Sequence, residues 1–382
     1  MFRFPVPELP ASAHELRQRV RHFLAEELEA GRWSPTTNSW MQYDAAFSKR
    51  CGDAGLVGLT LPRAYGGHER SAVDRHVVLE EMLAAGAPVG MHWIADRQSG
   101  PQIARHGSEG LRHRVLPRIA AGTCCFSIGM SEPGAGSDLA AVRTRAEAVE
   151  GGWRLNGGKL WTSHAHRADF AIVLARTSPA GDDRHAGLTQ FVVDMRAAGV
   201  ATRPMVDLTG SADFNEVLFD DVFVPDGDVL GQPGDGWRLV VSELAWERSG
   251  PERFLSSHAV VEELLREARR WSSADSSAPE AATLRTLGAQ VAQVMVLRQM
   301  SGALAAQIAA GRMPEVEAAL VKDLGATYER SVADTARRLS AGRGAALQAL
   351  IGPLLLAAPS FSLRGGTREI LRGIVAKRLE VA

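Results

Sequence analysis

The feature that most constrains the fold is a change in the spacing of apolar residues along the chain. Near the N-terminus, Leu16, Val20 and Leu24 recur at the spacing of about 3.6 residues that one face of a helix requires. From about Cys124, short runs rich in β-branched and aromatic residues are separated by Gly, Asn and Asp turns, which is typical of strands. From Trp237 onward the helical spacing returns. The sequence therefore predicts a helical region, a β region and a second helical region.

We place two domain boundaries where this spacing changes. Residues 1–122 are expected to form an N-terminal helical domain, 123–230 a middle β domain and 231–382 a C-terminal helical domain. Two long apolar stripes, 284–308 and 316–332, predict long amphipathic helices in the last of these. The layout is that of an α+β fold.

Three local signals refine this layout. Ser12 followed by Glu15 predicts a capping box at the start of the first helix. Glu150-Gly151-Gly152 predicts a hairpin turn inside the β region. The Ser-rich segment 272–279 predicts a flexible loop in the C-terminal region.

Charge and cysteine usage limit the classes of partner. The 43 basic and 44 acidic residues give a formal charge of -1, so we expect no nucleic acid and no anionic membrane as partner. The apolar runs are shorter than a membrane span, and Met1 is not followed by an export signal. Cys51, Cys124 and Cys125 form no disulfide framework, and the vicinal pair is expected to be buried and inert. We therefore expect a cytoplasmic protein that acts on a small molecule and holds no metal.

A glycine-rich turn carries the most specific chemical signal. The segment 131–138, Ser-Glu-Pro-Gly-Ala-Gly-Ser-Asp, directly follows a β run, so its backbone N–H groups can approach a ligand closely. Its spacing matches neither the G-x-G-x-x-G fingerprint nor a Walker A loop. The longer segment 126–138 closely resembles the "TEPGAGSD" signature of the acyl-CoA dehydrogenases.

Further blocks of that family follow in the expected order, so the resemblance covers nearly the whole chain. They are Leu56 to Gly67, Gly107 to Gly122, Leu155 to Ser163, Asp220 to Pro225, and Gly365 to Ala376. The resemblance implies an N-terminal helical domain, a middle β-barrel-like domain and a C-terminal four-helix bundle. That architecture matches the order of helical and β regions deduced from spacing.

The resemblance also implies FAD as cofactor. Ile128, Met130 and Ser131 would lie along the pyrimidine side of the flavin and offer it backbone amides and a hydroxyl. Trp161 would cover the ring as a rigid aromatic wall, although a core aromatic is the simpler alternative. Ser163 would place a hydroxyl near the flavin nitrogen that accepts hydride.

Other members of these motifs receive different roles. By the same resemblance, Thr367 belongs to the cofactor contacts and Ser137 contacts the thioester arm of the substrate. Glu132 and Asp138 are interpreted as structural residues of the turn. His164 and His166, just after the flavin motif, are interpreted as surface residues.

The catalytic base departs from the best-known family pattern. The reaction removes an α proton and transfers a β hydride to flavin, which requires a carboxylate base and hydrogen bonds to the thioester oxygen. Many members carry the base in a "Y-E-G-T" block, but Gly365 stands at that position here. A minority place it on the first long helix of the C-terminal domain, immediately before an Arg, where this chain has Glu247 and Arg248. We assign the base to Glu247; the alternative is a solvated helix glutamate. Gly365 keeps the backbone N–H of an oxyanion contact, and Arg248 is assigned to substrate binding.

Two blocks are eroded and one further residue departs from the family pattern. The Ser-rich segment replaces the family's "R-x-x-FG" block, and 339–344 retains only a remnant of "Q-x-x-GG-x-GY". In the family the Arg of the first block reaches across a dimer interface to the FAD pyrophosphate, so the inter-subunit FAD contacts are in question. Ala245 stands where an acidic contact to the CoA arm is usual.

These observations predict an oxidoreductase, an FAD-dependent flavoprotein that dehydrogenates an acyl thioester. The substrate would be an acyl-CoA or an acyl-carrier thioester, the electron acceptor a protein such as an electron-transfer flavoprotein, and the assembly a homodimer or homotetramer. One alternative is a flavin monooxygenase of the same fold. Another is a non-catalytic subunit that pairs with a homologous dehydrogenase.

Overall fold

The computed structural model describes residues 2–6, 8–274, 281–340 and 344–380. These residues form two compact units. The helical unit comprises residues 1–43, 71–89 and 245–382, and the sheet unit comprises residues 44–70 and 90–244. The N-terminal helices are thus shared between the two units.

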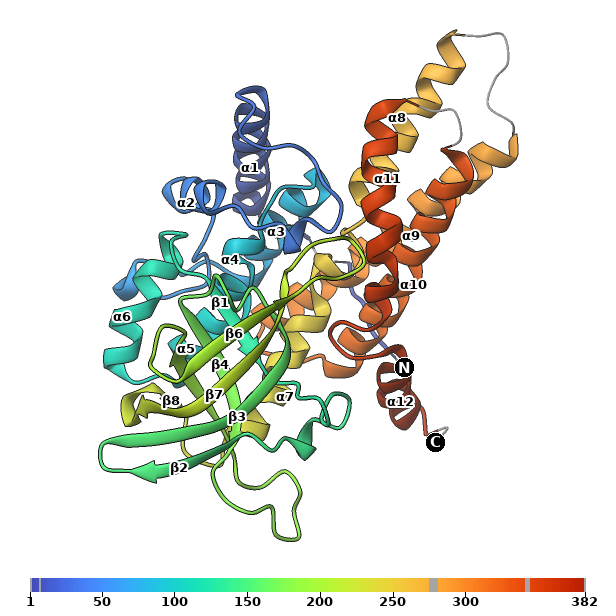
Figure 1. Ribbon diagram of the computed structural model, residues 1–382. Helices are drawn as coiled ribbons and strands as arrows, with labels where there is room; N and C mark the ends of the chain where they lie inside the picture. The colour runs from blue at the N-terminus through green and yellow to red at the C-terminus, as the bar shows by residue number, and fades with distance from the viewer. Residues whose placement is uncertain (1, 7, 275–280, 341–343, 381–382) are drawn as a thin grey trace. The chain divides into compact units, whose positions relative to one another are not determined.

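A mixed β-sheet forms the centre of the sheet unit (Figure 1). Its strands run in the order β6-β7-β3-β2-β4-β5-β8, and β1 pairs in parallel with β4. The side chains of β4 are nearly all buried, which explains its continuous apolar run, whereas β7 alternates between its two faces. The strands are β1 (Phe126–Gly129), β2 (Arg145–Val149), β3 (Gly152–Ser163), β4 (Phe170–Arg176), β5 (Leu188–Asp194), β6 (Val200–Met205), β7 (Phe214–Pro225) and β8 (Val229–Leu230).

The β2–β3 connection confirms the predicted hairpin turn. Val149 pairs with Gly152, and Gly151 between them adopts a φ of 75°, a conformation that glycine reaches without steric cost.

Helices cover this sheet and close its core. They are α2 (Ala45–Asp53), α4 (Gly90–Ile94), α5 (Gly100–His106), α6 (Glu109–Ala120) and the first part of α7 (Gly236–Ser249). One buried cluster joins Leu174 of β4 and Leu188 of β5 to Val240 of α7. The first turns of α7 are therefore packed on the sheet by apolar contact.

The helical unit is a helix bundle that also includes two helices from the N-terminal part of the chain. Its members are α1 (Ala11–Glu29), α3 (Ala72–Ala85), α8 (His258–Ala274), α9 (Ala281–Ala309), α10 (Glu315–Leu339), α11 (Ala345–Ala357), α12 (Arg368–Arg378) and the end of α7. Helix α8 contacts α9, α10 and α11, and α10 contacts both α9 and α11, so the predicted bundle is present within the described residues (Figure 1). Helix α3 packs on α8 and α9, and Glu80 ties it to Arg298 of α9 at 2.7 Å.

Short helical turns connect these elements. They are η1 (Ser39–Met41), η2 (Arg63–Tyr65), the π-helical η3 (Ala95–Ser99), η4 (Leu139–Ala141), η5 (Asp226–Asp228), η6 (Pro251–Arg253) and η7 (Ala358–Ser362). One segment of the described chain, Ala345–Ser362, is long and apolar enough to cross a membrane by length and composition alone. In the structure it is α11 with η7, and α11 belongs to the bundle.

Two local predictions were wrong or only partly tested. The capping box at Ser12 is absent because α1 begins at Ala11, directly after Pro10, so Ser12 lies inside the first turn. The flexible loop was predicted for residues 272–279. Residues 272–274 are instead the end of α8, and residues 275–279 lie outside the residues that the structure describes.

The cysteine prediction is confirmed for the vicinal pair. Cys124 and Cys125 are buried and free, and burial raises the pKa of each thiol to about 12. Both thiols therefore stay protonated near neutral pH, a form that is poorly nucleophilic.

Candidate functional site

A bulge in the sheet unit turns Trp161 outward. The register of β3 against β7 shifts between Lys159 and Thr162, and Trp161 adopts a φ of 60° that non-glycine residues rarely take. Its side chain is 60% exposed, and its ring meets the ring of Phe214 edge-on with centroids 6.0 Å apart. Trp161 is therefore a displayed surface aromatic and not a core residue. Strain of this kind commonly marks functional positions.

Two hydrogen bonds hold the predicted flavin segments side by side. Leu160 N–H donates to the carbonyl of Ser131 at 2.9 Å, and Ser127 Oγ donates to the carbonyl of Ser163 at 2.9 Å. The structure thus brings together the glycine-rich turn and the strand that carries Trp161. Partly exposed side chains along the two segments belong to Ile128, Met130, Ser131 and Ser163.

A buried ion pair holds the glycine-rich turn in place. Lys159 Nζ donates to Glu132 Oε1 at 2.8 Å, and the Glu132 carboxylate also accepts the backbone N–H groups of Arg143 and Thr144. Burial lowers the pKa of Lys159 to about 8, against the opposing effect of Glu132. Burial alone would raise the pKa of Glu132, but Lys159 and these hydrogen bonds hold it below its usual value. The Glu132 carboxylate therefore has a structural role in holding the turn.

Most of the remaining turn residues are exposed, although Ala135 is buried. Ser137 is exposed, so its hydroxyl is available for the predicted contact with a thioester arm. Asp138 is also exposed and pairs with Arg184 from the loop between β4 and β5.

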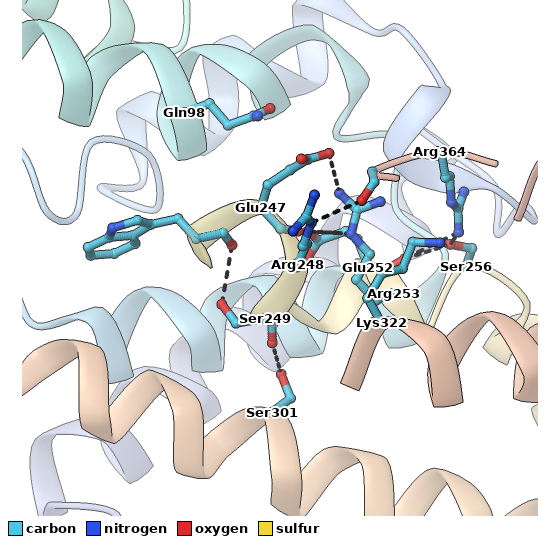
Figure 2. Close-up of polar contacts among 12 residues, drawn as sticks. Gln98, Glu247, Arg248, Ser249, Glu252, Arg253, Ser256, Ser301, Lys322 and Arg364 are labelled. Carbon is cyan, nitrogen blue, oxygen red and sulfur yellow. Dashed lines mark hydrogen bonds and ion pairs between the residues drawn. The ribbon is translucent and has the colours of Figure 1, made fainter. Parts of the chain in front are cut away.

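The predicted base lies in a cluster of charges in the helical unit (Figure 2). Arg253 Nη2 donates to Glu247 Oε1 at 2.8 Å, and Arg253 Nε donates to the Glu247 backbone carbonyl at 2.8 Å. The Glu247 side chain is 17% exposed and that of Arg253 is 3% exposed. Glu247 is therefore a largely buried, paired carboxylate rather than a solvated helix residue.

Gly365 lies directly against that carboxylate. A Cβ atom at position 365 would stand 3.1 Å from Glu247 Oε1 and 3.1 Å from Arg253 Cζ. The residue also has a φ of 69°, which an L side chain rarely adopts. Buried Arg248 donates from Nε to the Gly365 carbonyl at 3.2 Å. Although 118 positions separate them in the chain, Gly365 and Glu247 meet, and Arg248 holds the glycine in place.

Two further cations anchor the segment before Gly365. Lys322 Nζ donates to the Phe361 carbonyl at 3.0 Å, and Arg364 pairs with Glu329 at 2.7 Å. Burial, followed by the charges of Arg253 and Arg364, lowers the pKa of Lys322 to about 7. Arg253 and Lys322 belong to no recognisable spacing pattern, so the sequence carries no signal that marks them as members of this cluster.

Thr367 has a visible structural role. As N-cap of α12, its side chain accepts the backbone N–H of Ile370 at 3.5 Å. It belongs to the helical unit, whereas the other predicted flavin residues belong to the sheet unit.

The prediction that His164 lies on the surface was wrong. The residue is 1% exposed, because the chain turns at a φ of 55° after β3 and its N–H donates to the Asp213 carbonyl at 2.7 Å. Its ring lies 3.6 Å from the Asp213 carboxylate, whose pKa burial raises. His166 is partly exposed and meets Asn215 at 2.8 Å. Among the residues that the structure describes, no group of three His, Cys, Asp or Glu could hold a metal ion.

Comparison with known proteins places this geometry in a family. Models of the N-terminal, middle and C-terminal domains of acyl-CoA dehydrogenases match residues 10–123, 127–222 and 234–380. The acyl-CoA dehydrogenase IpdE1 of Mycolicibacterium smegmatis is 37% identical over 283 residues, covering 68% of this chain and 71% of that protein. The chain belongs to the acyl-CoA dehydrogenase family. IpdE1 of Mycobacterium tuberculosis is 40% identical over 242 residues, or 61% of this chain.

Solved acyl-CoA dehydrogenase structures extend the match to the whole fold. A structure described as the Tcur3481–Tcur3483 steroid ACAD has a TM-score of 0.85 at 25% identity and covers 98% of both chains. The ChsE4–ChsE5 complex from Mycobacterium tuberculosis has a TM-score of 0.82 at 28% identity, covering 98% of this chain and 99% of that one. The predicted α+β acyl-CoA dehydrogenase fold is confirmed. The matched stretch spans 62% of the M. tuberculosis IpdE1 and 45% of FadE34 from the same organism.

Proposed function

We propose that this chain is an FAD-dependent dehydrogenase of acyl thioesters in which Glu247 removes the α proton. One observation carries the proposal. The Glu247 carboxylate lies beside the point where a side chain at Gly365 would begin, 3.1 Å from the Cβ position of that residue. The two places to which the family resemblance assigns a base are therefore neighbours in space, which supports a carboxylate supplied from the helix.

The sheet unit fits the flavin that this family uses. The indole of Trp161 is held outward, and the segment with the partly exposed residues Ile128, Met130 and Ser131 runs beside the strand that carries it. When bound, FAD would supply the hydride acceptor. Trp161 would cover its ring, and the backbone N–H groups of Met130 and Ser131 with the hydroxyl of Ser163 would orient it.

The helical unit fits the proton chemistry. Glu247 would accept the α proton, and the N–H of Gly365 would donate to the thioester oxygen as negative charge builds there. Arg248 donates to the Gly365 carbonyl and so anchors the backbone at that residue. Ser137 would contact the thioester arm.

The relatives guide the choice of substrate. They are described as acyl-CoA dehydrogenases, among them isovaleryl-CoA dehydrogenases and a steroid ACAD. We therefore favour acyl-CoA over an acyl-carrier thioester, with branched and polycyclic acyl groups as the first to test. The electron acceptor is expected to be an electron-transfer flavoprotein, and cytoplasmic localisation stays a prediction.

Anaerobic bleaching of the flavin tests the proposal. Protein reconstituted with FAD should bind it stoichiometrically and lose its yellow colour when a matching saturated acyl-CoA is added. Rapid oxygen consumption by the reduced protein would favour the monooxygenase alternative. A protein that binds FAD but is bleached by none of a broad panel of thioesters would contradict the proposed reaction.

A second candidate role is membership of a two-chain assembly. Large apolar side chains are exposed on the bundle and the segment after it: Leu284, Met295 and Val296 of α9, Leu324 of α10, Leu356 of α11, and Leu363. Exposed apolar surface of this kind favours burial against another chain. The ChsE4–ChsE5 structure is a complex of two different proteins. Light scattering of the purified chain, alone and co-expressed with a homologous chain, would separate a homo-oligomer from a heteromer.

A further inference from the structure

Arg253 contacts the candidate base at two points. One guanidinium nitrogen, Nη2, reaches the Glu247 carboxylate, and another, Nε, reaches the Glu247 backbone carbonyl, both at 2.8 Å. Arg253 lies in η6, just beyond the end of α7, and Figure 2 shows its side chain turned back toward that helix. A single planar group therefore links the last turn of α7 to the side chain that this turn carries.

This arrangement restricts a side chain that is otherwise flexible. A glutamate side chain has three rotatable bonds and loses conformational entropy when it is held in one position. The guanidinium presents its donors in a fixed planar fork, so the Nε bond to the backbone carbonyl fixes the direction from which Nη2 reaches the carboxylate. A lysine amine could supply the charge but not that geometry.

The charge of Arg253 matters as much as its shape. A carboxylate that is 17% exposed has lost most of its water and favours the protonated form unless a cation compensates it. Nearby charges lie on several elements: Arg248 on α7, Glu252 beside Arg253, Lys322 and Glu329 on α10, and Arg364 before Gly365. The bond to the Glu247 carboxylate that Figure 2 draws comes from Arg253.

The backbone that carries Arg253 is itself fixed by close packing. A Cβ atom on Gly325 of α10 would stand 2.3 Å from the Arg253 carbonyl oxygen, so the two backbones touch where no side chain fits. The Arg253 N–H also donates to the Gly250 carbonyl at 3.2 Å. The guanidinium therefore projects from a rigid support toward Glu247.

We propose that Arg253 is a positioning residue that holds the Glu247 carboxylate in the ionised form and in the rotamer needed at Gly365. The proposal rests on the function proposed above. Arg253 touches neither substrate nor flavin in this role; it acts through Glu247.

Two variants test separately whether the geometry and the charge of Arg253 are required. Arg253→Lys keeps the charge and loses the fork, so flavin reduction at saturating substrate should slow by about 10- to 100-fold. The KM should stay within roughly twofold, because binding is not the step affected. Arg253→Gln also loses the charge, so the acidic limb of the pH–rate profile should move to higher pH, whereas Arg253→Lys should leave that limb in place.

The matched control is Arg364→Lys. Arg364 is a buried arginine of the same cluster, but its ion pair is with Glu329 rather than with Glu247. We expect a loss of thermal stability from Arg364→Lys with no shift of the acidic limb. If Arg364→Lys slowed flavin reduction as much as Arg253→Lys, Arg253 would be a structural residue only and the proposal would be overturned.

A titration without substrate keeps this test independent of the proposed reaction. Glutamate labelled with ¹³C at the carboxyl carbon reports ionisation directly, and Glu247→Gln identifies the resonance by its loss. The Glu247 resonance should titrate at higher pH in Arg253→Gln than in wild type. An unchanged titration would overturn the proposal even if the enzyme were active, whereas a shifted titration in a protein that no thioester bleaches would count against the dehydrogenase function alone.

Discussion

The two parts of the candidate site are built in opposite ways. In the sheet unit, one strand and the turn beside it carry an exposed aromatic side chain and several partly exposed residues. All of these residues lie within 127–163. In the helical unit, buried charges gather from α7, η6, α10 and the segment before α12, across more than 100 positions. The first part can be altered at the surface without disturbing a core. The second cannot, because each buried charge is compensated by its neighbours.

The largest expected effect tests the buried part. Glu247→Gln keeps the shape of the side chain but cannot accept the α proton, so flavin reduction should fall by about 10²- to 10⁴-fold. FAD content, measured by absorbance after denaturation, should not change, because the predicted flavin contacts are elsewhere. The control is Glu262→Gln on α8, an exposed carboxylate paired with His258. A Glu247 variant within a few-fold of wild type would remove the residue from the role of base.

The next prediction tests how tightly the same part is packed. Gly365→Ala places a methyl group 3.1 Å from Glu247 Oε1 at a positive φ, so we expect a loss of about 1–3 kcal/mol in stability. Flavin reduction should slow as the carboxylate is displaced. Gly373→Ala on α12 is the control, because a methyl group there meets open space in a helix and should stabilise by about 0.5–1 kcal/mol. Thermal melts of the two variants should therefore shift in opposite directions.

Substitution of the exposed aromatic Trp161 in the sheet unit should change cofactor binding without lowering stability. Trp161→Gly should weaken FAD binding, measured by fluorescence titration, while the melting temperature of the apoprotein stays the same or rises, because glycine relieves the positive φ. Trp93→Ala in the core of the sheet unit, where the side chain is 2% exposed, should cost about 3–5 kcal/mol. Equal stability losses in the two variants would contradict the contrast between displayed and buried aromatics.

The smallest effect is a pH dependence of stability. Burial and the charges of Arg253 and Arg364, opposed by Glu329 and Glu247, lower the pKa of Lys322 to about 7 in the folded protein. Between that value and its ordinary pKa near 10.5, the unfolded chain binds the extra proton, so stability should rise with pH by at most ~1.4 kcal/mol per unit. Lys322→Met removes the titrating group. Its stability relative to wild type should therefore be greatest below pH 7 and should decline as pH rises, as measured by chemical denaturation at several pH values.

The order of helical and β regions was predictable because it depends on apolar spacing, which is local. The strand at 170–176 and the turn at Glu150-Gly151-Gly152 follow from the same kind of signal. The edge strand at 200–205 escaped prediction because it is largely exposed and contains Pro204, so no alternation marks it.

The site itself was predictable only where residues are close in sequence. Lys159 and Trp161 stand two positions apart and would share a face of a regular strand, yet the first is buried and the second exposed, because a bulge and a positive φ at Trp161 interrupt the alternation. The pairing of Glu247 with Arg253 depends on a turn after α7 and on backbone contact with Gly325. No spacing in the sequence records that contact, so the network around the base required the structure.

The contact between Gly365 and Glu247 also links two sequence positions to one another. A Cβ atom at 365 would stand 3.1 Å from Glu247 Oε1, closer than ordinary van der Waals contact, so a side chain at 365 would crowd a carboxylate supplied by α7. Moving the base from one position to the other therefore takes two coordinated substitutions, and either one alone gives a crowded or an empty centre. Across relatives, these two positions are expected to vary together, and the pair, more than either residue by itself, identifies which helix supplies the acid.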